Sequence, residues 1–196
     1  MKQSRKSLRL SKKQSRKKPL SVAITGGIGA GKTEALKAFA RHGAATVSSD
    51  EIVHDLIEND EHVRSALLER FGTTRRSEIA EIVFGDRDEL AWLEALLHPR
   101  VVDRYLEWRE RQTAPLTVTE VPLLYETGGE SRFDKVVVIT APTELRDSRR
   151  PMPDDRETRL IDDEEKVKRA DYSYVNTGSL DDLDAFVKSV VDDLVP

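Results

Sequence analysis

Eight residues near the start of the chain constrain its fold more than any others. Residues 26–33 read GGIGAGKT and satisfy every fixed position of the pattern G-x-x-x-x-G-K-[ST]. The apolar run at 20–25 predicts a buried strand before them, and residues 34–40 predict a helix after them. A strand, a glycine-rich loop and a helix in this order are the context in which the pattern forms a phosphate-binding loop.

Each residue type in this loop has a physical role. Glycines let backbone N–H groups turn inward around phosphate oxygens, and the N-terminus of the following helix adds partial positive charge. Lys32 is expected to reach the β- and γ-phosphates of ATP, and the Thr33 hydroxyl to bind Mg²⁺. The predicted ATP-binding residues here are Gly26, Gly27, Ile28, Gly29, Ala30, Gly31, Lys32, Thr33 and Glu34.

Composition narrows the class of protein. Hydrophobic residues make up 38% of the chain and charged residues 35%, which is typical of a charge-rich globular protein. The absence of cysteine excludes disulfides, thiolate metal sites and a cysteine nucleophile. No apolar run approaches the roughly 18–20 residues of a membrane span, and no apolar stretch of a secretory signal follows the basic start. We therefore expect a cytoplasmic protein without a membrane partner.

Charge is unevenly distributed along the chain. Residues 1–19 hold nine lysines and arginines and no acid, whereas residues 20–196 carry 36 acidic and 23 basic residues. The segment is either a solvated, disordered tail or an arm for nucleic acid or an anionic surface. It contains no aromatic residue for base stacking, which favours the tail and makes a nucleic-acid partner unlikely.

From residue 20 onward, strand and helix patterns alternate. Uniformly apolar runs are typical of strands covered on both faces, and apolar residues at three- and four-residue spacing predict helices. Strands are expected at 20–25, 44–48, 116–119, 135–140 and 172–175, and helices at 32–42, at 181–194 and over most of 51–70 and 76–111. Pro99 is expected to mark a helix boundary or kink. The order predicts an α/β fold, a doubly wound, mostly parallel sheet of about five strands.

Domain organisation follows from the same pass along the chain. A single domain is expected over 20–196, after the basic tail at 1–19. Within it, 51–111 reads as a helical insertion that binds substrate, and the charged segment 143–166 reads as a short lid over the site.

Acidic and basic side chains follow several predicted strands. Asp50 and Glu120 each come at the end of a strand, where the ligands of parallel sheets bind. A carboxylate there can hold Mg²⁺ or accept a proton from an attacking hydroxyl, although Asp50 fits a helix N-cap as well. Arg146, Arg149 and Arg150 follow the strand at 135–140. They either stabilise a transferring phosphoryl group or form a solvated face.

Blocks along most of the chain resemble the bacterial dephospho-coenzyme A kinases. The blocks are VAITGGIGAGKT (22–33), SSDEIVH (48–54), FG (71–72), IAEIVF (79–84), LEALLHPRV (93–101), VPLLYE (121–126), FDKVVVITAP (133–142) and KRADYSYVNTGSL (168–180). Many unrelated proteins share the glycine loop, so the ordered H-P-R-V and V-P-L-L-Y-E blocks make the resemblance specific. It implies a nucleotide-kinase-like phosphate-loop fold and transfer of the ATP γ-phosphate to the ribose 3′-hydroxyl of dephospho-CoA, with Mg²⁺, in the last step of coenzyme A synthesis.

The resemblance also implies roles for residues at matching positions. The implied catalytic residues are Asp50 as base, Lys32, and one of Arg146 and Arg149 as the lid arginine. Asn176 and Gly178 would lie near the adenine of ATP. The implied substrate-binding residues are His98, Pro99, Glu120, Pro122, Leu123 and Leu124, and the implied metal ligand is Thr33.

The chain departs from the family pattern at several places. Ser48 stands where the family has the first aspartate of D-A-D, and Glu120 replaces the usual aspartate before V-P-L-L. The lid is several residues short, which leaves the identity of the lid arginine open. A kinase for another nucleoside or nucleotide, and an ATPase acting on a macromolecule, stay as alternatives. The protein is expected to be a monomer or weak oligomer.

Overall fold

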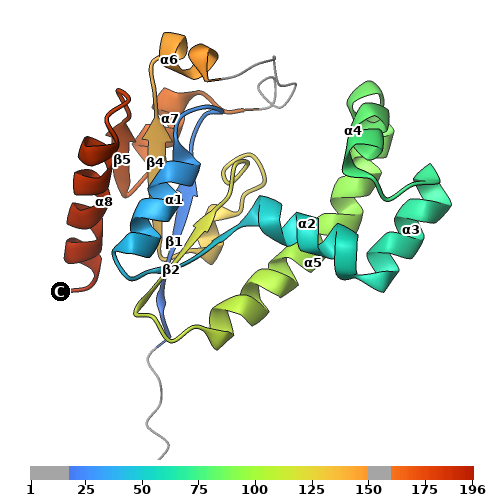
Figure 1. Ribbon diagram of the computed structural model, residues 1–196, viewed down its shortest axis with the longest axis horizontal. Coiled ribbons are helices and arrows are strands. Elements are labelled where there is room, and N and C mark those ends of the chain that lie inside the picture. Colours follow the sequence, from blue (N-terminus) through green and yellow to red (C-terminus); the bar gives the residue numbers. More distant parts are fainter. Residues whose placement is uncertain (1–17, 150–159) are drawn as a thin grey trace, which may run out of the picture.

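The computed structural model describes residues 18–149 and 160–196, and its centre is a five-stranded parallel sheet. The strand order is β2-β3-β1-β4-β5, so the chain passes from the central strand β1 to the edge strand β2, returns to β3, and then crosses to β4 and β5 on the other side (Figure 1). The strands are β1 (Leu20–Thr25), β2 (Ala45–Ser48), β3 (Leu116–Glu120), β4 (Lys135–Thr140) and β5 (Tyr172–Val175). The predicted doubly wound α/β fold is confirmed.

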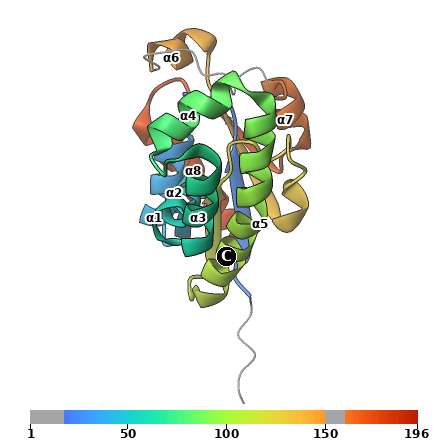
Figure 2. The ribbon, with the colours of Figure 1, turned by 90° about the vertical axis from the view of Figure 1, so that its right-hand side faces the viewer.

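Helices connect these strands, and four of them form a separate lobe. The helices are α1 (Lys32–Arg41), α2 (Ser49–Asn59), α3 (Glu61–Phe71), α4 (Arg76–Gly85), α5 (Arg87–Arg111), α6 (Thr143–Ser148), α7 (Asp163–Arg169) and α8 (Leu180–Leu194), with a short 3₁₀ turn, η1 (Glu130–Arg132). Helices α2–α5 project to one side of the sheet as the predicted insertion, and Figure 2 views this lobe face-on.

Alternation along the strands divides the core into two layers around the sheet. Val22 and Ile24 of β1 point to α1 and α8, where they join Phe39 and Val187 in one buried cluster. Ala23 points to the opposite face and packs with residues of β4 and of the segment after β3. A third cluster fills the helical lobe between α2 and α5. Burial on both faces explains why β1 and β4 are mostly apolar.

Helix boundaries differ from the predicted ones at two places. The region predicted as mostly helical at 51–70 divides at Asp60, whose carboxylate caps α3 by accepting from His62 N and Val63 N at 3.1 Å. Helix α5 continues through Pro99, so a helix boundary there is wrong, and the alternative of a kink stays a prediction. Packing of the α5 apolar side chains against the lobe outweighs the loss of one backbone hydrogen bond.

Two predicted segments lie largely outside the described residues. The basic tail at 1–19 overlaps the described part of the chain only at Lys18 and Pro19, and residues 150–159 of the predicted lid, including Arg150, are likewise outside it. Among residues 18–149 and 160–196, no helix is both long and apolar enough to cross a bilayer.

Candidate active site

The glycine loop closes tightly onto neighbouring elements after β1. Gly26 has φ +141° and Gly31 has φ +102°, values that side-chain-bearing residues rarely adopt. A Cβ on Gly26 would overlap the Ile139 carbonyl of β4, and one on Gly31 would overlap the Asn176 amide. Glycine is therefore required at both positions by backbone conformation and by space.

Lys32 and Thr33 begin helix α1 and carry the polar groups of the loop. The Lys32 ammonium is almost buried and donates to the Gly26 and Gly27 carbonyls at 3.1 and 2.9 Å. The Thr33 hydroxyl lies 3.3 Å from one carboxylate oxygen of Glu120, at the end of β3. The structure thus brings Lys32, Thr33 and Glu120 together at the carboxyl edge of the sheet, as the sequence predicts.

Asp50 lies next to this cluster, in the first turn of α2. The helix cap is Ser48, whose hydroxyl accepts from Asp50 N at 3.2 Å while Glu51 accepts from Ser48 N at 3.1 Å. The alternative that Asp50 is the N-cap is therefore wrong. The capping box also gives Ser48 a role of its own, at the position where the family has an aspartate. The Asp50 side chain is exposed at the carboxyl edge of the sheet.

Glu120 has an electrostatic environment unlike that of Asp50. Burial raises the pKa of its carboxyl above the ordinary value, the positive charge of Lys32 opposes this, and the negative charge of Asp50 adds to it. The side chain is 8% exposed. Glu120 is thus enclosed behind Thr33, whereas Asp50 is exposed to solvent.

Arg146 and Arg149 of the α6 region both contact the glycine loop. Arg149 Nη1 donates to the Gly29 carbonyl at 3.0 Å. Arg146 Nη1 lies against Gly27 and donates to Asp163, the first residue of α7, at 3.3 Å. Because both guanidinium groups contact the loop, the alternative that these arginines only form a solvated face does not describe them. Both stand where positive charge would meet a phosphate held by the loop.

Asn176 supports the loop from the end of β5. Its side-chain amide donates to the Ala30 carbonyl at 2.8 Å, and its oxygen accepts from Gly178 N at 2.9 Å. The side chain is 3% exposed. Asn176 therefore reaches the site through the loop backbone, and Gly178 turns the chain beside Arg149. Glu34, also predicted to contact ATP, pairs with Lys37 on α1 at 2.7 Å.

The residues predicted to bind the second substrate are dispersed. His98 and Pro99 are exposed on α5, in the helical lobe. The Pro122 carbonyl accepts from Thr25 at 3.3 Å, and Leu123 is half-buried. Leu124 has no exposed surface and packs in the core against Ala23 of β1 and Val138 of β4, and its contact with substrate stays a prediction.

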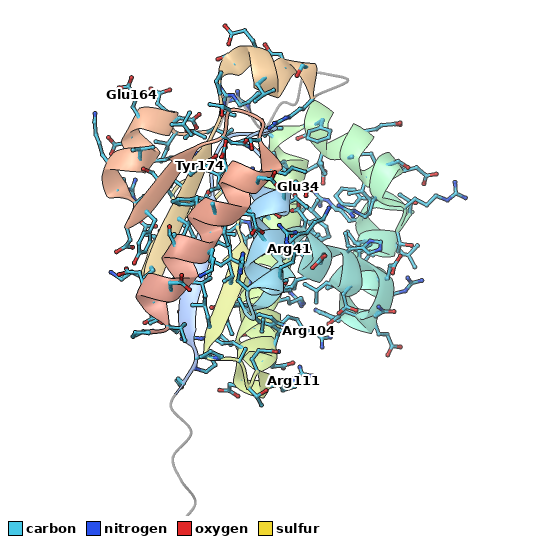
Figure 3. All side chains as sticks on the ribbon, turned by 60° about the vertical axis from the view of Figure 1, so that its left-hand side comes forward. Glu34, Arg41, Arg104, Arg111, Glu164 and Tyr174 are labelled. Atoms are coloured by element: carbon cyan, nitrogen blue, oxygen red, sulfur yellow. The ribbon has the colours of Figure 1, made fainter. Side chains whose placement is uncertain are left out.

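A cavity of about 430 Å³ lies between the edge strand β2 and helices α2 and α5. Its lining includes Val47, Glu51 and Trp108, with Arg104 and Arg111 on α5. Figure 3 labels these two arginines on the part of α5 farthest from α6 and α7. The cavity belongs to the helical insertion but is lined by neither His98 nor the glycine loop.

Two charged pairs that involve α7 are not predictable from the sequence. One is Arg146 with Asp163, and the other joins Lys166 of α7 to Glu126 at 2.9 Å, with Lys166 fully buried. The VPLLYE block contains Glu126, but no spacing rule indicates that it faces a lysine forty residues later. A lysine inside an otherwise charged, exposed-looking segment carries no local signal of burial.

The donor groups at the loop suit Mg²⁺ bound together with a nucleotide. Thr33 and Glu120 supply oxygen atoms, which Mg²⁺ prefers, and Asp50 lies close by. Within the described ranges, no three acidic or histidine side chains gather into a metal site. Mg²⁺ typically takes one or two protein oxygens and completes its shell with phosphate oxygens and water. The residues present fit that arrangement.

Comparison with known proteins identifies the family. The dephospho-CoA kinase family model matches residues 20–182. The dephospho-CoA kinase of Chlamydia abortus is 34% identical over 183 residues, covering 84% of this chain and 91% of that protein. The dephospho-CoA kinase of Thermus thermophilus is 35% identical over 190 residues, covering 91% and 93%.

A solved structure agrees with these relatives. The crystal structure of TT1252 from Thermus thermophilus superposes with a TM-score of 0.79 at 34% identity, covering 92% of this chain and 100% of that one. The glycine loop, the sheet order and the matches over nearly the whole described chain lead to one conclusion. This chain belongs to the dephospho-CoA kinase family.

Proposed function

We propose that this protein transfers the γ-phosphate of ATP to the 3′-hydroxyl of dephospho-CoA, giving CoA and ADP. The observation that carries the proposal is the meeting of four side chains at one edge of the sheet, in a chain that matches the family over residues 20–182. Lys32, Thr33 and Glu120 border the loop, and Asp50 stands beside them on the open side. We further propose that it acts in the cytoplasm.

Asp50 is the group that accepts the proton of the acceptor hydroxyl. The hydroxyl oxygen forms a bond to the γ-phosphorus, the bond between this phosphorus and the β-γ bridging oxygen breaks, and ADP leaves. The hydroxyl proton passes to the Asp50 carboxylate, which later returns it to water. Asp50 is the better base than Glu120 because it is exposed to a second substrate, whereas Glu120 is buried behind Thr33.

The loop and its neighbours hold the nucleotide. Backbone N–H groups of the loop would bind the phosphates, and the Lys32 ammonium is held at the loop by the Gly26 and Gly27 carbonyls. Thr33 and Glu120 would hold Mg²⁺, which supplies positive charge that the transferring phosphoryl group requires. Arg146 and Arg149 add positive charge at Gly27 and Gly29.

Product identification tests this function. The purified protein is incubated with ATP, Mg²⁺ and dephospho-CoA, and the products are resolved by mass spectrometry. Appearance of CoA with stoichiometric ADP is expected, with no comparable product from a panel of free nucleosides and nucleotides. Phosphorylation of a panel member in preference to dephospho-CoA would contradict the assigned substrate, and ATP hydrolysis alone would contradict the assigned transfer.

A further inference from the structure

An ion pair links the two helical segments that flank the glycine loop. Arg146 lies on α6, which follows β4, and Asp163 begins α7, which precedes β5. Arg146 Nη1 lies 3.3 Å from Asp163 Oδ2, and the two side chains are only 20% and 28% exposed. A Cβ on Gly27 would overlap Arg146 Nη1 and would lie 3.4 Å from Asp163 Oδ1. The pair therefore rests directly on the loop backbone.

Arg146 has hydrogen-bond donors beyond the one that Asp163 uses. Its Nε atom is buried and has no hydrogen-bond partner among the described residues. A guanidinium is planar, with five N–H donors in a fixed fork, so a carboxylate that holds one nitrogen also sets the direction of the others. The Arg146 side chain as a whole is 20% exposed, so an acceptor oxygen brought to the loop would meet the accessible nitrogens of a guanidinium whose plane is already set.

Helix α7 is itself anchored, which makes Asp163 a rigid support. Glu126, in the segment after β3, accepts from Ile161 N at 2.9 Å and pairs with the fully buried Lys166 at 2.9 Å. Asp163 lies between these two attachment points in the sequence. Its carboxylate is therefore held at a fixed place relative to the sheet, and the loop emerges from the same sheet.

We propose that Asp163 is a positioning residue that holds the Arg146 guanidinium over Gly27, aimed at the terminal phosphate of ATP. This inference rests on the proposed function and deepens it by assigning the orientation of one arginine to one carboxylate. Charged donors fixed before the reaction stabilise a transition state without reorganising during it, so the pair contributes to turnover more than to folding.

A double-mutant cycle tests the proposal. Asp163→Ala is expected to lower kcat by about ten- to a hundredfold, the scale of a misplaced catalytic group. The double variant Asp163→Ala/Arg146→Ala is expected to be no slower than Arg146→Ala alone, because Asp163 acts only through Arg146. Asp163→Glu, which keeps the charge, should recover part of the activity. Independent, multiplicative losses in the double variant would overturn the proposal, as would an Asp163→Ala enzyme of full activity.

Glu164 provides the matched control. It also lies in the first turn of α7, is exposed, and points outward from the helix in Figure 3. Glu164→Ala removes the same charge from the same helix but is expected to leave kcat and the unfolding midpoint unchanged. A loss equal to that of Asp163→Ala would show a general charge effect of α7 and would overturn the specific role.

A binding measurement separates this inference from the proposed function. Calorimetry without acceptor compares the affinities for ADP and for a non-hydrolysable ATP analogue. Asp163→Ala is expected to weaken analogue binding relative to ADP binding, and an unchanged ratio would overturn the proposal. If the unsubstituted protein phosphorylates no dephospho-CoA, the proposed function fails, while this ratio still decides whether Asp163 orients Arg146 toward the terminal phosphate.

Discussion

Ser48, Asp50 and Glu120 lie close together at the carboxyl edge of the sheet but differ in burial and in hydrogen bonding. Ser48 is the N-cap of α2, so the neighbouring Asp50 side chain is not needed as the cap, and it is exposed to solvent. Glu120 is buried against Thr33, and burial raises the pKa of its carboxyl. Two carboxylates from adjacent strand ends thus differ in burial, and this difference is the ground for our proposal that Asp50 takes the proton and Glu120 contacts the nucleotide or metal.

Asp50→Asn is expected to separate catalysis from stability. The variant keeps the shape of the side chain but removes the proton acceptor, so kcat should fall by roughly a hundred- to ten-thousandfold. ATP affinity should change little, because Lys32 and the loop amides remain. The unfolding midpoint should also stay, because Ser48 provides the cap. A folded variant with full activity would transfer the proposed role to Glu120.

Lys32→Ala is expected to disable the loop. The ammonium carries the charge closest to the loop carbonyls of Gly26 and Gly27, and its loss should lower turnover by at least about a hundredfold, as for a well-placed electrostatic stabiliser. Steady-state kinetics with ATP and dephospho-CoA measure this. Near-normal turnover would show that the loop is not the ATP site.

At the scale of elements, charged pairs attach segments that the sheet alone does not hold. The pair between Glu126 and Lys166 joins the segment after β3 to α7 and is almost fully enclosed. Nearby, Arg169 of α7 pairs with Glu130 of η1, and its guanidinium lies 4.2 Å from the centre of the Tyr125 ring. These contacts fix α7 before the chain enters β5.

Lys166→Met is expected to be strongly destabilising because it leaves Glu126 buried without its cation. The free energy of unfolding should fall by about 3–5 kcal/mol, measured by urea denaturation. The double variant Lys166→Met/Glu126→Leu should recover much of this loss, since replacing both charges removes the uncompensated one. Equal losses in the single and double variants would show that the pair is not what stabilises this contact.

Asp134, just before β4, links the start of β1 to the start of β4. Its carboxylate accepts from Ser21 N at 2.8 Å and Ser21 Oγ at 2.7 Å and lies 3.3 Å from Arg109 Nη2. Burial alone would raise the pKa of Asp134, but the Ser21 hydrogen bonds and the Arg109 charge bring it below its ordinary value.

Because the folded-state pKa of Asp134 is lowered, its contribution to stability is present above the unfolded pKa and is lost as the pH falls through the folded pKa. When the pH is lowered from about 5 to about 3, the thermal unfolding midpoint of Asp134→Asn should therefore fall less than that of the unsubstituted protein. Thermal unfolding at a series of pH values measures this. Parallel pH profiles of the two proteins would contradict the assigned interaction.

At the scale of the whole molecule, a charge-rich sheet domain follows a strongly basic segment. Pro19, just before β1, contacts helix α5: its carbonyl accepts a hydrogen bond from Arg109 Nη2 at 2.9 Å. Residues 1–17 lie outside the described part of the chain, and the interpretation of the basic segment as a tail stays a prediction.

A chain that begins at Lys18 is expected to keep the kinetic constants and the thermal midpoint of the full chain, since it retains the Pro19 contact. A large loss of either would show that the removed segment packs on the domain. Nucleic-acid binding that weakens with salt and disappears on truncation would instead support the arm.

The amino-acid sequence by itself determined the framework of this protein. The glycine pattern at 26–33 located the phosphate loop, and residue patterns located all five strands, most clearly β1 and β4, whose mostly apolar runs are buried on both faces. Helix ends were less predictable. Asp60 divides a helical region and α5 passes through Pro99, because capping and lobe packing compete with local propensity.

Only the tertiary structure decided which polar side chains meet at the loop. Asn176 reaches Ala30 across 146 positions, and Arg146 reaches Asp163 across 17, although neither spacing carries a local signal. Leu124, beside candidate site residues in the sequence, turned out to be a core side chain. The physical reason is the strand order β2-β3-β1-β4-β5, which places strand ends distant in sequence along one edge. That order fixes which side chains meet there, and residue spacing along the chain does not encode it.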